Sequence, residues 1–168
     1  MKKLFPFLLA LIVVQSCEEP VEITETMAIN QSATITINET NGTAVNFNDV
    51  IEGDLNQVIS NFISINDITI DSLSYSFSNL IGNENVSIVN ASIEINGITV
   101  AEVSEVNIAQ EIDNESVFQI TDLNVLDQLE TSFLSNSSVT LNLTGMAISD
   151  EGDVSFDIGI SMQLTASF

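Results

Sequence analysis

The chain has 168 residues and a formal net charge of −22, because 24 Asp and Glu stand against 2 Lys and Arg and no His. Such an anionic surface repels phosphate backbones, which excludes nucleic-acid binding through basic contacts. The hydrophobic fraction of 45% is far above that of a disordered acidic tail. We therefore expect one folded domain with a sizeable core.

The segment from Met1 to Cys17 has the layout of a secretory signal peptide. Both lysines of the chain precede an apolar run that ends at Val14, and the only cysteine follows directly after Ser16. These residues resemble the bacterial lipobox, in which an aliphatic residue three positions before the cysteine and a small residue just before it permit cleavage. The resemblance implies that residues 1–16 are removed and that Cys17 is lipidated.

Two alternatives compete with the lipobox. A transmembrane helix needs about 20 apolar residues, and the run before Val14 is much shorter. A plain secretory signal would leave Cys17 as a free thiol, but a lone cysteine directly after the small-residue exit is better explained as an acylation site.

Residues 17–30 are predicted to form an acidic tether that can include a first strand. The tether is expected over Glu18 to Thr26, where glutamates follow the cysteine closely. Acidic residues at this place resemble the surface-export signals of Bacteroidota lipoproteins. The resemblance implies an outer-membrane protein that is lipid-anchored, on the periplasmic side or at the cell surface.

Residues 31–168 are predicted to form a single β-sandwich domain. This part has no proline, and apolar residues alternate with Ser, Thr and Asn over many short stretches. Asn41-Gly42 and Asn96-Gly97 are turn signals, and Asn96-Gly97 suits a two-residue hairpin loop. The stretch 154–168 alternates without a break and predicts one long strand.

Three stretches change the phase of alternation, which indicates β-bulges. They lie near Asp71-Ser72, between Ile88 and Ala91, and around Gly145. Long bulged strands are typical of curved sheets. The predicted fold class is therefore all-β, an antiparallel β-sandwich or a barrel-like relative of it.

Two stretches instead have helical spacing and predict two short helices. Their apolar positions are Leu55, Val58, Ile59, Phe62 and Ile63 in the first, and Leu123, Leu126, Leu129 or Phe133, and Leu134 in the second. Asp54 and Asp122 are the expected N-caps.

The residue types of the mature chain exclude most enzyme classes. Without His, Lys, Arg or a second Cys, it lacks the base of a Ser-His-Asp triad, a Schiff-base lysine and the usual zinc ligands. Chemistry that needs only carboxylates, as in a glycan hydrolase, is the enzymatic alternative. We expect a protein that is not an enzyme.

Acidic turns are candidate calcium sites, because calcium prefers hard oxygen ligands. One set surrounds Gly152 and consists of Asp150, Glu151, Asp153 and Asp157; a second surrounds Gly53 and consists of Asp49, Glu52 and Asp54. Neither matches an EF-hand loop, and a solvated acidic turn is the alternative interpretation.

Asp71-Ser72-Leu73 resembles the short O-glycosylation acceptor of Bacteroidota, which implies that Ser72 carries a glycan. The bulge predicted at the same place is the alternative explanation for this triplet.

These observations predict a lipid-anchored cell-envelope lipoprotein that acts as a non-catalytic structural or binding module. Its expected partners are the membrane, through the lipid on Cys17, and another envelope protein or a glycan; calcium is the one candidate cofactor. The alternatives are the carboxylate-dependent glycan hydrolase and a carrier of small apolar ligands, since long alternating strands can enclose a cavity.

Overall fold

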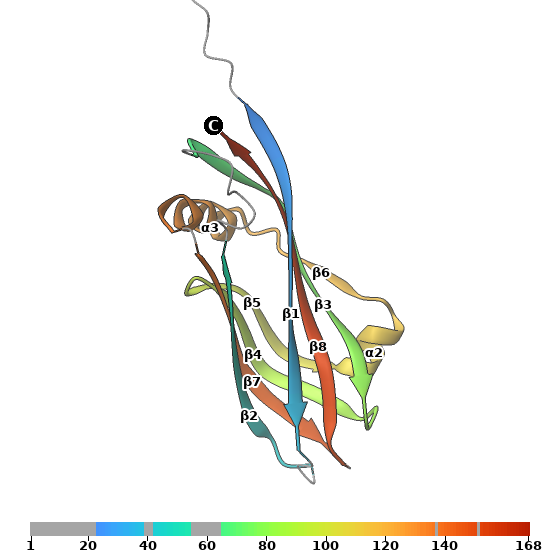
Figure 1. Ribbon diagram of the computed structural model, residues 1–168. Coiled ribbons are helices and arrows are strands. Elements are labelled where there is room, and N and C mark those ends of the chain that lie inside the picture. Colours follow the sequence, from blue (N-terminus) through green and yellow to red (C-terminus); the bar gives the residue numbers. More distant parts are fainter. Residues whose placement is uncertain (1–22, 39–41, 55–64, 137, 151) are drawn as a thin grey trace, which may run out of the picture.

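The computed structural model describes residues 23–38, 42–54, 65–136, 138–150 and 152–168 (Figure 1). In chain order its elements are β1 (Thr24–Ile37), β2 (Val45–Asp54), β3 (Asp67–Ile81), β4 (Val86–Ile95), β5 (Ile98–Asn107), α2 (Ile108–Asp113), β6 (Val117–Gln119), α3 (Leu123–Ser135), β7 (Ser138–Ser149) and β8 (Val154–Ser167).

The strands form two four-stranded antiparallel sheets packed face to face. One sheet has the order β1-β8-β3-β6 and the other has the order β2-β7-β4-β5. Two such sheets, with eight strands passing between them in this order, make a jelly roll. The predicted antiparallel β-sandwich is confirmed, and the core lies between the sheets (Figure 1).

Strand β8 is the centre of the first sheet. It pairs with β1 from Thr24↔Ser167 to Ile37↔Val154 and with β3 on its other side. The alternation predicted for this strand is confirmed. Its buried apolar residues are Val154, Phe156, Ile158, Ile160, Met162, Leu164 and Ala166. Such alternation turns one face of the strand to the core and the other outward.

Two of the three predicted bulges are present. In β3, the register with β8 shifts between Ile70 and Ser72, and the backbone N–H of Ile70 donates to Oε1 of Glu130 on α3 at 2.7 Å. In β4, the register with β7 shifts between Val89 and Ser92, where Asn90 has a φ of 49°. Each shift keeps apolar residues on the core side of the strand before and after it.

The phase change predicted around Gly145 is wrong. Strand β7 keeps one parity, since Leu143 and Ala147 are buried on either side of Gly145. A Cβ on Gly145 would lie 2.7 Å from the ring of Phe47 and 2.8 Å from Cβ of Ala91. Glycine therefore occupies a core position where the Phe47 ring takes the space of a side chain.

The helix predicted from residue 123 is confirmed as α3. Asp122 is its N-cap and accepts a hydrogen bond from the backbone N–H of Asn124 at 2.9 Å. The other predicted helix, over residues 55–63, lies outside the described residues. Helix α2, which was not predicted, follows β5 directly, and Asn107 caps it by accepting from Gln110 N–H at 2.9 Å.

The two-residue turn at Asn96-Gly97 is confirmed, with φ values of 51° and 78°. Its asparagine also joins three elements. Asn96 Oδ1 accepts from the backbone N–H of Thr140 at 2.8 Å, and its Nδ2 donates to Ser132 Oγ on α3 at 3.0 Å. The turn thereby fixes α3 against the start of β7.

The jelly roll has two distinct ends. At one end the chain enters β1 and leaves β8, and the N–H of Phe168 donates to the carbonyl of Ile23 at 2.9 Å. Because β1 begins at Thr24, the last three residues of the expected tether belong to the strand. The β1–β2, β3–β4 and β7–β8 connections lie at the opposite end, called the loop end below (Figure 1). No helix in the described ranges is long and apolar enough to cross a membrane.

Candidate binding surfaces

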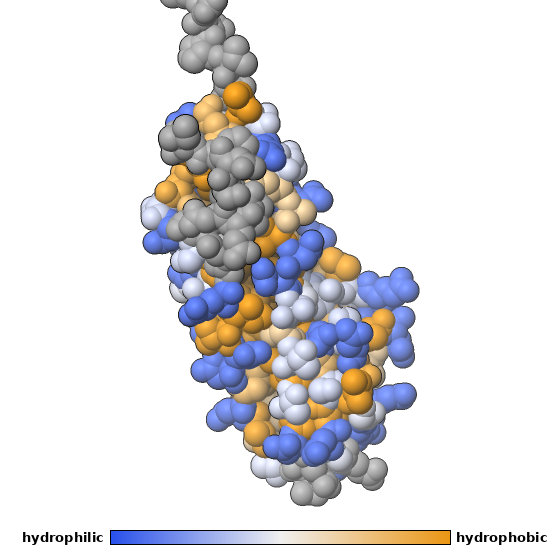
Figure 2. All heavy atoms as spheres, viewed as in Figure 1, coloured by the Kyte–Doolittle hydropathy of each residue, from blue (hydrophilic) through white to orange (hydrophobic). Residues whose placement is uncertain are grey.

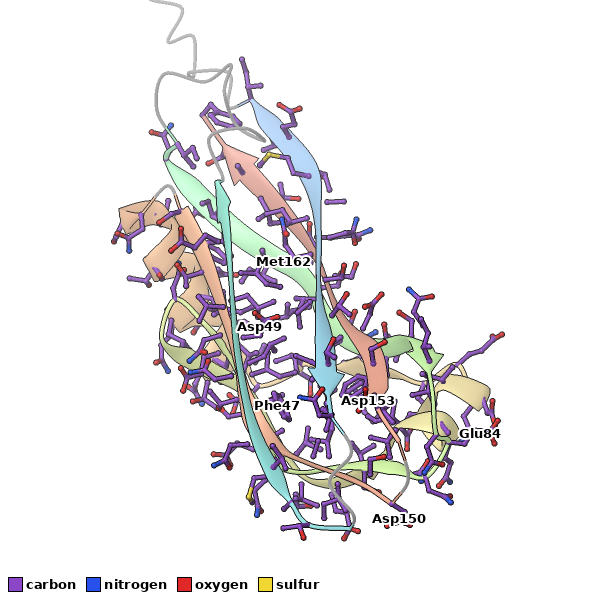
Figure 3. The ribbon with its side chains drawn as sticks, turned by 60° about the horizontal axis from the view of Figure 1, so that its bottom comes forward. Phe47, Asp49, Glu84, Asp150, Asp153 and Met162 are labelled. Carbon is purple, nitrogen blue, oxygen red and sulfur yellow. The ribbon has the colours of Figure 1, made fainter. Side chains whose placement is uncertain are left out.

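The loop end carries exposed acids on separate connections. Figure 3 shows Glu84 between β3 and β4, and Asp150 and Asp153 between β7 and β8, spread apart and not converging on one point. The backbone fixes these loops tightly. The N–H of Gly42 donates to the carbonyl of Ser149 at 3.1 Å, and the backbone of Gly82 packs against the carbonyl of Asp153.

The acids proposed to bind calcium around Gly152 are not brought together. Asp157 lies on the outer face of β8, where Thr34 Oγ1 and Asn79 Nδ2 each donate to its carboxylate at 2.6 Å. These hydrogen bonds hold the pKa of Asp157 below its ordinary value, the one from Asn79 most strongly. Glu151 lies outside the described residues.

The second acidic set does not form a turn either. Gly53 lies within β2, where it pairs with Val139, and Asp49 and Glu52 have opposite parity on this strand. Oδ1 of Asp49 accepts from the neighbouring Val50 N–H at 3.0 Å. Across the described part of the chain, no three Asp, Glu, His or Cys side chains gather closely enough to hold a metal ion. Calcium binding stays a prediction.

Melting temperatures measured in sodium chloride and in calcium distinguish general screening of the negative charges from a specific calcium site. Because the anions repel one another, we expect the melting temperature to rise with sodium chloride, as the Debye length falls below about 8 Å. A gain of about 1 kcal/mol corresponds to roughly 2 to 4 °C in a domain of this size. Thermal scans at matched ionic strength test calcium: an additional rise, with heat in a calorimetric titration, would demonstrate a specific site, and a melting temperature insensitive to salt would contradict the repulsion.

Ser72, the predicted glycan acceptor, lies in β3 directly after the bulge and pairs with Gln163. Its side chain is partly exposed on the outer face of the sheet. The neighbouring Asp71 accepts a hydrogen bond from Thr165 Oγ1 at 2.8 Å. Glycosylation of Ser72 stays a prediction. Cys17 lies outside the described residues.

The outer face of the β1-β8-β3-β6 sheet has a shallow polar hollow of about 280 Å³. Gly159 on β8 lies in it between β1 and β3, and the lining groups are mostly hydroxyls and amides. They are Asn30, Gln31, Ser32, Ser74, Ser76, Gly159, Ile160 and Ser161. Ser161 Oγ donates to Asn30 Oδ1 at 2.8 Å. Uncharged groups of this kind suit hydrogen bonding to a neutral polar ligand. The face drawn in Figure 2 mixes hydrophilic and apolar side chains without one continuous hydrophilic patch.

A larger groove, of about 620 Å³, lies where the two sheets are open to each other. We call it the open-edge groove, because β6 and β5, the last strands of the two sheet orders, both line it. Its lining residues are Tyr75, Val100, Ala101, Glu102, Val117, Phe118, Gln119, Ile120, Thr121 and Asp122. The groove was not predicted from the sequence.

An aromatic stack forms the floor of the open-edge groove. The rings of Tyr75 and Phe118 are stacked with centroids 4.7 Å apart, and Phe77 meets both rings edge-on. Tyr75 is only 8% exposed, and its hydroxyl has no hydrogen-bond partner among the described residues. Burial, and then the negative charge of Glu111 on α2, raise the pKa of Tyr75 above its ordinary value. The phenol is therefore a protonated donor at neutral pH.

Comparisons with known proteins found a similar solved structure but no related family. No protein-family model matches it, and no curated protein matches it. Among solved structures, it is similar to the one titled "Crystal structure of decameric BFDV Capsid Protein", with 9% sequence identity and a TM-score of 0.42. That similarity covers 86% of this chain and 99% of that chain.

Proposed function

We propose that this protein is a lipid-anchored lipoprotein of the bacterial outer membrane that serves as a non-catalytic binding or structural module. The observation that carries the proposal is that the start of β1 and the acidic loops lie at opposite ends of the jelly roll. Strand β1 begins at one end of the domain, and the acidic loop end lies opposite (Figure 1). Anchoring at Cys17 would direct the loop end away from the membrane.

The length of β1 sets the distance between the anchored end of the domain and the loop end. The strand has 14 residues, and at about 3.3 Å per residue it spans roughly 45 Å. The loop end would stand up to about that far from the start of β1, beyond the headgroups of the membrane. The chain has no cation after Lys3, so its anionic body is repelled by an anionic bilayer and the lipid supplies the attachment.

Replacing Cys17 with alanine is expected to release the protein from the membrane fraction of expressing bacteria. Acyl chains contribute about 0.8 kcal/mol for each buried methylene, and the variant has no thiol to carry them. Immunoblots of membrane and soluble fractions provide the measurement. Gln15→Ala, at the same junction but outside the two positions that fit the lipobox, serves as the matched control and should stay with the membrane. Unchanged fractionation of Cys17→Ala would contradict the proposal.

A further inference from the structure

We propose that the open-edge groove binds an extended, basic segment of a partner protein, with an apolar side chain on the Tyr75–Phe118 floor and a neighbouring Lys or Arg at the acidic rim. The inference adds a partner class to the binding module proposed above. It does not depend on the lipid anchor, because the groove is formed by residues of the folded domain alone.

The floor of the groove offers apolar contact together with one polar group. Phe118 of β6 is half-buried, and the preceding Val117, which is 58% exposed on the opposite face of the strand, also lines the groove. Across the groove, Val100 of β5 supplies a second apolar wall. An apolar side chain that enters here would remove this surface from water. The Tyr75 hydroxyl, which has no partner among the described residues, would donate to a carbonyl of the bound segment.

Two free strand edges favour an extended peptide over a compact ligand. Among the described residues, β5 pairs with β4 alone and β6 pairs with β3 alone. Each edge therefore presents backbone N–H and C=O groups beside the groove. An added strand uses such groups for main-chain hydrogen bonds and places alternate side chains into pockets.

The rim determines the charge of the partner. Glu102 on β5 and Asp122 at the start of α3 are both exposed and both line the groove, and Glu111 lies close enough to act on Tyr75. No cation follows Lys3 anywhere in the chain, so no basic side chain of the domain neutralises them. A second copy of this chain would bring more negative charge, whereas a Lys or Arg residue is complementary.

The only tyrosine of the chain provides a direct readout. The protein has no tryptophan, so protein emission excited near 280 nm comes from Tyr75 alone. The probe is a short capped peptide in which valine and lysine alternate, added to the purified full chain at low salt. We expect a saturable change in Tyr75 emission, less quenching of Tyr75 by acrylamide, and weaker binding at high salt.

Variants test both parts of the groove. Glu102→Gln should weaken binding of the valine–lysine peptide about twofold to fivefold, the range of one exposed ion pair. Glu105→Gln, which removes an exposed acid of the same strand outside the groove, should leave it unchanged. Val117→Ser should weaken binding, while Val50→Ser, an equally exposed valine on β2, should have no effect.

Several results would overturn the proposal. A valine–glutamate peptide that binds as well would remove the role of charge, and a serine–lysine peptide that binds as well would remove the role of the floor. An equal effect of spermine would show that the groove takes small cations without a strand. Equal losses in Glu102→Gln and Glu105→Gln would reduce the effect to net charge. None of these results bears on the release of Cys17→Ala from membranes.

Discussion

Replacing Gly82 with alanine is expected to lower the free energy of unfolding by about 2 to 4 kcal/mol. Gly82 has a φ of 107°, where residues with a side chain are strained. A Cβ at this position would also overlap the backbone carbonyl oxygen of Asp153. Because that oxygen belongs to the backbone between β7 and β8 and not to a flexible side chain, the backbone at this contact would have to shift.

A second glycine, Gly97, distinguishes the cost of backbone strain at positive φ from the cost of a steric overlap. Gly97 has a φ of 78°, and a Cβ there would meet no atom within 4 Å. Gly97→Ala should therefore cost only about 1 kcal/mol, the conformational part of the effect. Denaturant unfolding of both variants gives the two free energies. Equal losses would mean that the packing of Gly82 against Asp153 contributes nothing to stability.

The turns, the helix cap and the bulges could be predicted because each depends on the conformational preferences of a few neighbouring residues. The Asn96-Gly97 turn depends on two residues that adopt positive φ at low cost, and the α3 cap depends on one carboxylate at Asp122. The bulge after Ile70 follows from a change of parity that would otherwise turn apolar residues to solvent. Each of these features is written within a few neighbouring positions.

The strand order could not be predicted, because pairing between distant strands leaves no local pattern. Strand β8 pairs with β1 and β3, both far away in the sequence. The phase change predicted at Gly145 was wrong for a similar reason. The space beside this glycine is filled by Phe47 from the distant strand β2, and Leu143 and Ala147 keep the same parity on either side of it. Helix α2 is only six residues long, too short for a helical period to stand out.

The candidate surfaces were harder to predict than the fold. Acidic residues close together in sequence were expected to share a turn. Asp157 instead lies within β8, about 13 Å beyond Asp153 at roughly 3.3 Å per residue, and accepts hydrogen bonds from Thr34 and Asn79. The open-edge groove depends on β5 and β6 lying at corresponding ends of two sheets, which only the topology reveals. One local signal existed, since Tyr75 is the only tyrosine of the chain.

Truncating Phe156 to alanine is expected to cost about 3 to 5 kcal/mol, the largest loss for a single core residue here. Phe156 is 0% exposed, and its ring meets Phe77 edge-on with centroids 6.4 Å apart. Phe77 in turn contacts Tyr75 and Phe118, so one aromatic cluster runs from the core to the open-edge groove. Phe156→Leu, which keeps most of the volume, should cost about 1.5 kcal/mol or less.

The same variant tests the apolar-carrier alternative. Deleting a buried ring leaves an apolar cavity, and such cavities can bind benzene or xenon. If the interior of the natural protein is a packed core, Phe156→Ala should be stabilised against thermal unfolding by benzene and the unchanged protein should not. Equal stabilisation of both would mean that the natural protein already holds a cavity between its sheets. That result would favour a carrier over a module that binds at its edges and loops.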